Sequence, residues 1–235
     1  MVTTQPSTTV GVEKGEKMMR IFLMISMVCL LAGCSADIPF KIDHRATANS
    51  EYKVNDIVCP DFACVYEEDR CYRRFLGIDI NGYAIVQDFY ASGEKRTSPY
   101  QLPMIEVKDR YPKGMNGMYF VWDINGHKTT ERYYVDGVQE GNSFFYYSNG
   151  QMRSVHRYQN GVYEGDYATW YESGQKMAEG SYKHGAPNGV ICVWYENGQI
   201  KEQEEYREGE RVSFSREWDE DGNLTYEKDY GSLPN

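Results

Sequence analysis

Runs of alternating apolar and polar residues, broken by glycine at regular intervals, fill the chain from Gly117 onward. Such alternation predicts β-strands, because successive side chains of a strand point to opposite faces. The glycines form three series, and neighbours within each series are 24 residues apart. A fixed period of this length predicts a tandem array of one structural unit. The series are Gly117, Gly141, Gly165 and Gly189; Gly126, Gly150, Gly174, Gly198 and Gly222; and Gly137, Gly161, Gly185 and Gly209.

Each 24-residue unit is expected to form one β-hairpin. An Asn-Gly, Ser-Gly or Asp-Gly pair at positions 9 and 10 supplies the positive φ angles of a tight turn. The strands then cover roughly positions 2–7 and 12–18, and the glycine at position 21 redirects the chain into the next hairpin. Residues 117–235 hold five such units. The last begins at Ser213 and carries a polar Arg216 at position 4, as suits a terminal repeat.

Two aromatic columns recur with the same period. Both occupy even positions of the unit, so they are expected on one face of the sheet, where Cys192 would be a small core residue. One hairpin cannot bury enough surface alone, but stacked hairpins would bury a continuous aromatic stripe. The expected fold class is therefore all-β, an elongated single-layer antiparallel sheet of tandem hairpins. The columns are Trp122, Tyr146, Trp170, Trp194 and Trp218 at position 6, and Tyr134, Tyr158, Tyr182, Tyr206 and Tyr230 at position 18.

The array extends more weakly upstream of Gly117. Residues 89–95, FYASGEK, echo WYESGQK at 170–176, so residues 84–116 are expected to form a degenerate repeat with an insertion. A further decayed hairpin is expected around Asn81-Gly82, within a divergent, cysteine-containing cap at residues 52–83. Residues 34–51 are polar and lack periodicity, which predicts a flexible tether.

The N-terminal segment points to export. A basic Arg20 precedes an apolar stretch, Ile21 to Leu31, that is too short to span a bilayer. The next residues, Leu31-Ala32-Gly33-Cys34, resemble the lipobox of bacterial lipoproteins. The resemblance implies that residues 1–33 are a signal peptide and that Cys34 carries a lipid anchor, palmitate included. It also implies a place in the cell envelope, at the outer membrane of a Gram-negative organism because no Asp follows Cys34.

Three further cysteines, Cys59, Cys64 and Cys71, cluster with the spacing C-x4-C-x6-C. One disulfide among them suits an exported protein, but free thiols and a metal site are alternative interpretations. The metal interpretation lacks a second cysteine pair or a nearby histidine.

Catalytic motifs are absent from the sequence, which contains no G-x-S-x-G, H-E-x-x-H or phosphate-binding glycine loop. His127, His156 and His184 occupy three different positions of the repeat and do not form a ligand column. No enzyme activity, cofactor, metal or small-molecule substrate is therefore expected. The net charge of −10, with 20 acidic against 11 basic residues from Gly117 onward, argues against nucleic acid as a partner.

The pattern Y/W-Y-x-N-G-Q-x7-Y-x-x-G-x3-G resembles the MORN-repeat variant (membrane occupation and recognition nexus) of bacterial proteins. Many of these proteins carry the label of a YwqK-type antitoxin component of a toxin–antitoxin system. The resemblance, together with the lipobox, implies a membrane-anchored scaffold that binds an unknown protein partner, as an antitoxin or immunity protein would. The alternative is glycan or peptidoglycan binding by the Trp/Tyr column.

Overall fold

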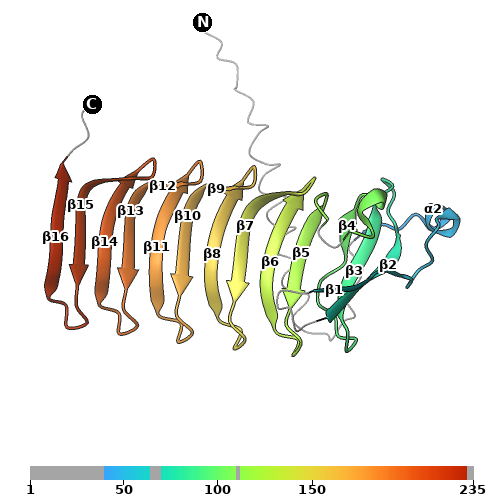
Figure 1. Ribbon diagram of the computed structural model, residues 1–235, viewed down its shortest axis with the longest axis horizontal. Coiled ribbons are helices and arrows are strands. Elements are labelled where there is room, and N and C mark those ends of the chain that lie inside the picture. Colours follow the sequence, from blue (N-terminus) through green and yellow to red (C-terminus); the bar gives the residue numbers. More distant parts are fainter. Residues whose placement is uncertain (1–39, 64–69, 110–111, 232–235) are drawn as a thin grey trace, which may run out of the picture. The chain divides into compact units, whose positions relative to one another are not determined.

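The computed structural model describes residues 40–63, 70–109 and 112–231. These residues form two antiparallel sheets with very little helix, which confirms the all-β fold class (Figure 1). The expected signal peptide, the lipidation site Cys34 and the cluster residue Cys64 lie outside the described residues.

The first sheet has four strands, and their buried side chains form most of the main hydrophobic core. Phe75, Tyr100 and Leu102 are fully buried there, and the side chains of Val58 and Val107 close the cluster. The strands lie in chain order, with a short α-helix before them and a 3-10 helix after them. The elements are α2 (His44–Asn49), β1 (Ile57–Ala63), β2 (Arg70–Ile78), β3 (Ala84–Tyr90), β4 (Tyr100–Leu102) and η1 (Met104–Glu106).

Residues 40–51 belong to this folded unit, so the expectation of a flexible tether is wrong for them. The Asp43 side chain caps α2 by accepting hydrogen bonds from the backbone N–H groups of Arg45 and Ala46, both 2.9 Å. The Thr47 hydroxyl accepts a 2.8 Å bond from the backbone N–H of Ile78 in β2. The polar side chains of this segment form hydrogen bonds with backbone N–H groups of the fold. A search for hydrophobic periodicity does not detect a segment that is ordered in this way.

The second sheet contains the repeats, and each hairpin adds two strands to an open row (Figure 1). Short strands β9 and β12 pair with β8 and β11 beside the main row. The strands are β5 (Gly117–Trp122), β6 (Lys128–Val135), β7 (Val138–Tyr146), β8 (Met152–Gln159), β9 (Val162–Tyr163), β10 (Gly165–Trp170), β11 (Lys176–Lys183), β12 (Ala186–Pro187), β13 (Gly189–Trp194), β14 (Ile200–Arg207), β15 (Glu210–Trp218) and β16 (Leu224–Gly231).

Two kinds of turn alternate along the array, and the tight turn is not the one that the sequence predicted. At positions 7–11 the chain makes a longer turn, in which only the glycine has a positive φ, as at Gly150 (+85°). The two-residue turn lies at positions 20 and 21, where both Asn160 (+51°) and Gly161 (+78°) are left-handed. Two left-handed residues define a type I′ turn, which Asn, Asp and Gly tolerate best. The prediction placed the tight turn with its positive φ angles at the Asn-Gly, Ser-Gly or Asp-Gly pairs of positions 9 and 10, which is wrong.

The upstream repeat uses the same longer turn. The backbone N–H of Tyr90 donates to the carbonyl of Glu94, and that of Gly93 donates to the carbonyl of Tyr90, both at 2.9 Å. The matching bonds at Tyr171 and Gly174 measure 2.8 and 2.9 Å. The strands β2 and β3 form one more hairpin that turns at Asn81-Gly82, so the expected boundary at 83/84 falls between paired strands.

Strand register places the two aromatic columns on opposite faces, which overturns the prediction of a single aromatic face. Gly141 pairs with Tyr158, and Phe144 pairs with Val155. Directly paired residues share a face, so an even position here shares a face with an odd one. Tyr158 therefore lies on the face opposite Phe144 and Tyr146. We call the face with positions 4, 6, 12 and 15 the tryptophan face, and that with positions 3, 14, 16 and 18 the tyrosine face.

The expected continuous core stripe is only half-buried. In the described chain, the fully buried apolar side chains lie between Val58 and Val107, and the repeats contribute Val212 alone. The position-6 aromatic rings are all of intermediate exposure. Figure 1 shows no second layer of described chain over β7 to β16, so both faces of these hairpins carry partly exposed aromatic rings.

Candidate functional site

The tryptophan face carries all four tryptophans of the chain, one in every hairpin except the second, which has Tyr146. Charged pairs lie among the rings. Lys128 Nζ is 5.7 Å from the centroid of the Phe120 ring and 5.1 Å from that of Tyr146, and it forms an ion pair with Glu131. Cation–π contacts and ion pairs of this kind make the face amphipathic, as interaction surfaces are.

A ladder of tyrosine hydroxyls fixes the spacing of these rings. The Tyr at position 7 donates a hydrogen bond to the backbone carbonyl of the position-6 residue in the next unit. This role was not predicted from the sequence, although Tyr147, Tyr171 and Tyr195, each 24 residues apart at position 7, are a visible signal of it. The bonds are Tyr147 to Trp170 (2.7 Å), Tyr171 to Trp194 (2.8 Å), Tyr195 to Trp218 (2.9 Å) and, from the upstream repeat, Tyr90 to Trp122 (2.9 Å).

Tyr171→Phe is expected to lower the free energy of unfolding by about 0.5–1.5 kcal/mol, because one hydrogen bond is lost while the ring is kept. Urea denaturation followed by tryptophan fluorescence measures the change. Tyr133→Phe is the control, since Tyr133 is 41% exposed and outside the ladder. Equal effects of the two substitutions would contradict a stabilising ladder.

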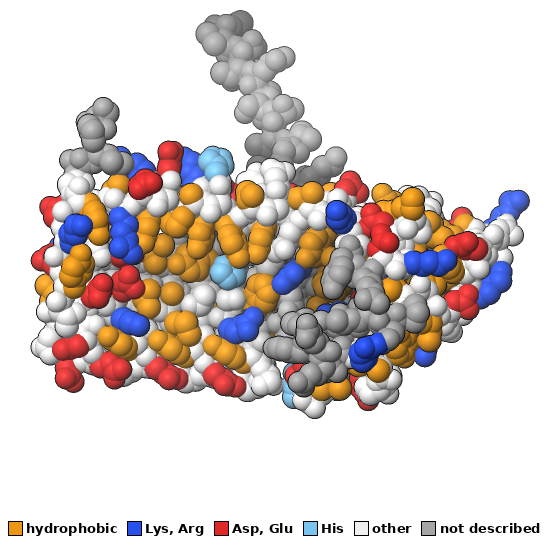
Figure 2. Space-filling model, in the orientation of Figure 1, with side chains coloured by type: hydrophobic (Ala, Val, Ile, Leu, Met, Phe, Trp, Pro, Cys, Tyr) orange, Lys and Arg blue, Asp and Glu red, His pale blue; other side chains and the backbone are white. Residues whose placement is uncertain are grey.

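Acidic side chains line the edge formed by the longer turns. Glu172, Glu196 and Glu220 occupy position 8 of three successive hairpins, are exposed, and form no ion pair within the described chain. Figure 2 shows acidic side chains along this edge below rows of hydrophobic ones. Neighbouring turns are interlocked, because the side-chain amide of Asn149 donates to the carbonyl of Glu172, and that of Asn197 to Glu220, both at 3.1 Å.

The tyrosine face carries a closed ring of four aromatic side chains. The ring centroid of His156 lies 5.3 Å from that of Tyr163 and 5.8 Å from that of Tyr167. The ring centroid of Tyr182 lies 5.1 Å from that of Tyr163 and 5.2 Å from that of Tyr167. Gly180 makes room for this packing, because a Cβ there would lie 2.9 Å from the Tyr167 ring. These rings pack across neighbouring strands of the sheet. Within the described part of the chain, the cluster contains no carboxylate beside its histidine, so we assign it a structural role.

Acidification is expected to destabilise the protein through His156. Burial lowers the pKa of His156 below its ordinary value of 6.5, and its Nδ1 has no hydrogen-bond partner among the described residues. The unfolded chain therefore binds a proton more readily than the folded chain. The contribution of neutral His156 to the free energy of unfolding is fully present above pH 6.5, and it is lost as the pH falls below that value.

The thermal unfolding midpoint at pH 7.5 and pH 5.5 measures this effect. The difference between the two values should shrink in His156→Gln, which cannot be protonated in this range. A difference as large in His156→Gln as in the natural protein would assign the pH dependence to other groups.

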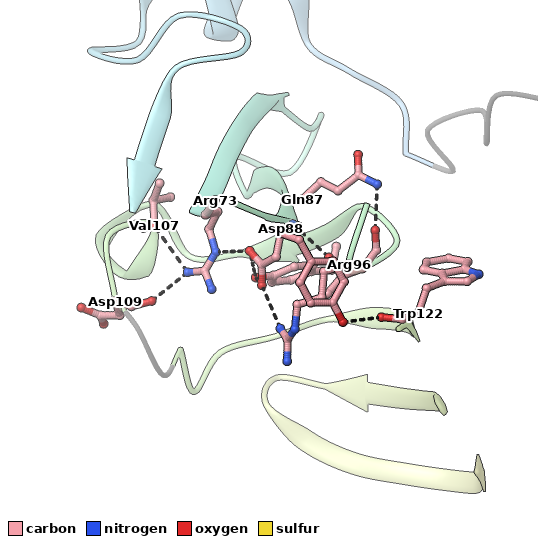
Figure 3. Close-up of polar contacts among 10 residues, drawn as sticks. Arg73, Gln87, Asp88, Arg96, Val107, Asp109 and Trp122 are labelled. Atoms are coloured by element: carbon pink, nitrogen blue, oxygen red, sulfur yellow. Dashed lines mark hydrogen bonds and ion pairs between the residues drawn. The ribbon is translucent and has the colours of Figure 1, made fainter. Parts of the chain in front are cut away.

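A buried ion pair, shown in Figure 3, holds the four-stranded sheet to the segment that leads into the repeats. Arg73 is 1% exposed, and its Nε donates to the Asp88 carboxylate at 2.8 Å. Its Nη1 donates to the carbonyl of Asp109, also at 2.8 Å, and the Tyr100 hydroxyl donates to Asp88 at 3.0 Å. Burial and the neighbouring carboxylate raise the pKa of Tyr100, which stays protonated as a donor. The arrangement is that of a structural anchor.

The cysteines expected to act together are only partly described. Cys59 and Cys71 are buried beside Tyr90, and Cys71 is disulfide-bonded. Cys192 lies half-buried on the tryptophan face, where the side-chain amide of Gln203 is 3.8 Å from its sulfur.

The histidines lie apart. His127 Nδ1 is 3.1 Å from Asp123, and His184 Nδ1 is 3.7 Å from Glu164. Within residues 40–63, 70–109 and 112–231, no three His, Cys, Asp or Glu side chains are grouped as a metal site would need. The described helices are too short or too polar to cross a membrane.

The fold and this surface define an open repeat protein built from β-hairpins. The family model described as MORN repeat variant matches residues 139–160, 163–184 and 187–208, which confirms the predicted resemblance over three consecutive repeats. No curated protein matches the chain. One solved structure, described as the crystal structure of a GtfA/B complex bound to UDP and GlcNAc, aligns with 78% of this chain and 36% of its own. Its sequence identity of 12% and TM-score of 0.21 support no conclusion about function.

Proposed function

We propose that the protein is a membrane-anchored scaffold of the cell envelope, and that its tryptophan face binds a protein partner. The observation that carries this proposal is the row of half-exposed Trp and Tyr rings, one per hairpin, on a face that no second layer of the described residues covers. Aromatic residues are enriched at protein interfaces, where they provide most of the binding energy.

Further exposed hydrophobic side chains add to this face. Met118 and Tyr133 pair across β5 and β6, and Val135 pairs with Val138, which places all four on the tryptophan face. Each is 41–43% exposed, and Val162 on the same face is 45% exposed. Monomeric proteins rarely expose contiguous apolar patches, so this patch supports a binding role.

The envelope location rests on the lipobox at Leu31-Ala32-Gly33-Cys34. An exported antitoxin could not reach a toxin in the cytosol. The version of the antitoxin label that agrees with export is an immunity-like lipoprotein that binds a toxin acting in the envelope.

Site-specific photo-crosslinking in the native membrane tests the proposal. A benzophenone amino acid replaces Val190 on the tryptophan face or, as a matched control, Tyr226 on the tyrosine face. Val190 is 43% exposed and Tyr226 is 40% exposed, and Tyr226 pairs with Glu217 at position 5 of its unit. We expect one defined protein adduct from position 190 and little from position 226. Equal adducts from both faces, or none, would contradict the proposal, and Cys34→Ala should release the protein from the membrane.

Glycan binding by the tryptophan column is the second candidate, because half-exposed indole rings could stack on sugar rings. All four tryptophans lie on one face, so their fluorescence reports on that face alone. Soluble peptidoglycan fragments that shift this fluorescence and protect it from iodide quenching would favour the glycan.

A further inference from the structure

Three successive hairpins repeat the same pair of residues at the edge formed by the longer turns. Each has a half-exposed tryptophan at position 6 and an exposed glutamate two residues later, at the start of the longer turn. The tyrosine ladder and the interlocked turns connect these hairpins. The pairs are Trp170 and Glu172, Trp194 and Glu196, and Trp218 and Glu220.

The distance between these pairs follows from the sheet. Neighbouring strands lie about 4.8 Å apart, so two strands per hairpin give a repeat of about 9.6 Å across the sheet. A polyproline II helix has three residues per turn and a rise of about 3.1 Å, which gives about 9.3 Å per turn. An α-helix advances about 5.4 Å per turn and loses register after one or two hairpins. A polyproline II segment can therefore present one turn to each hairpin.

The chemistry of the face agrees with such a ligand. Backbone N–H and C=O groups within the sheet are used by its strand pairing, so the face binds through side chains. Proline offers no N–H group, packs well on aromatic rings and enters the complex already ordered. The exposed carboxylates of Glu172, Glu196 and Glu220 can pair with basic side chains of a ligand, and the chain as a whole carries a net charge of −10.

We infer that the tryptophan face of β10 to β16 binds a proline-rich, basic segment of a partner protein in the polyproline II conformation. The segment crosses the hairpins, with one ligand turn and one basic side chain for each Trp/Glu pair. This inference rests on the proposed scaffold function and names the chemistry of the partner.

Synthetic peptides added to the purified full-length chain test the inference through tryptophan fluorescence. The ligand is a 12-residue peptide of four Pro-Pro-Arg triplets. A peptide of the same composition with irregularly spaced arginines tests the register, and four Gly-Gly-Arg triplets test the polyproline II conformation at equal charge. We expect the regular peptide to bind at least ten times more tightly than either control.

Charge variants give the matched control on the protein. Glu172→Gln, Glu196→Gln and Glu220→Gln together should weaken the regular peptide at least tenfold without lowering the unfolding midpoint, because all three side chains are exposed. Asp136→Asn, Glu208→Gln and Glu217→Gln remove the same charge from exposed positions in the two-residue turns and on the tyrosine face, and should leave binding unchanged.

Equal binding of the Gly-Gly-Arg peptide, or of the irregular peptide, would overturn the inference in favour of charge attraction alone. A response to peptidoglycan fragments with none to the regular peptide would overturn it in favour of a glycan. Adducts from position 190 without peptide binding would leave the scaffold proposal standing and refute this ligand. Peptide binding without any adduct would refute the envelope scaffold instead.

Discussion

Asp88→Ala is expected to lower the free energy of unfolding by about 3–5 kcal/mol, because it removes the carboxylate partner of a buried guanidinium. Arg73 and Asp88 have side chains only 2% and 3% exposed and are 2.8 Å apart. The same substitution takes away the acceptor of the buried Tyr100 hydroxyl. At about 2–4 °C per kcal/mol for a chain of this size, the unfolding midpoint should fall by about 10 °C.

The double substitution Arg73→Met and Asp88→Leu is the matched control. Apolar side chains of similar volume can replace a buried ion pair at little cost, so the double variant should be clearly more stable than Asp88→Ala. Calorimetry of the three proteins gives the comparison. A double variant less stable than Asp88→Ala would show that the ion pair contributes through its bonds to the chain at Asp109 more than through charge compensation.

The repeat fold was predictable because its signals are local. A left-handed residue is needed at each turn, and glycine at positions 10 and 21 marks those turns with the 24-residue period. Position 1 of the unit has the same requirement, since Ser213 takes a left-handed φ of +63° where the other four units have glycine. The three matched repeats then agree with the period read from glycine alone.

The faces and the anchor could not be read in the same way. The face on which a second-strand residue lies depends on the strand register across the turn. A change of one residue in that register moves the whole second strand's side chains to the opposite faces. The pair Arg73–Asp88 and the bond from Arg73 to Asp109, 36 residues away, belong to no periodic pattern. The tyrosine ladder was visible as a period, but its bonds to backbone carbonyls need coordinates.

The second large effect is expected at Gly137, where the last segment before the repeats meets the first two-residue turn. A Cβ on Gly137 would lie 1.5 Å from the carbonyl oxygen of Lys113, a backbone atom that cannot move without its chain. The N–H of Gly137 donates a 2.8 Å bond to the carbonyl of Met115. Gly137→Ala should therefore displace residues 113–115 and lower the free energy of unfolding by about 2–4 kcal/mol, the sum of overpacking and left-handed strain.

Gly161→Ala separates these two causes. Gly161 occupies the same turn position with nearly the same φ, +78° against +79°, but its Cβ would meet only Val138, at 3.5 Å. It should cost about 1 kcal/mol, the left-handed strain alone. Urea denaturation measures both variants, and faster hydrogen exchange at residues 112–116 should appear only in Gly137→Ala. The segment before the repeats is held at its start by the bond from Arg73 to Asp109 and at its end by the bond from Gly137 to Met115. If the two glycine variants lowered the free energy of unfolding equally, the contact at Gly137 would not position this segment and Arg73 alone would.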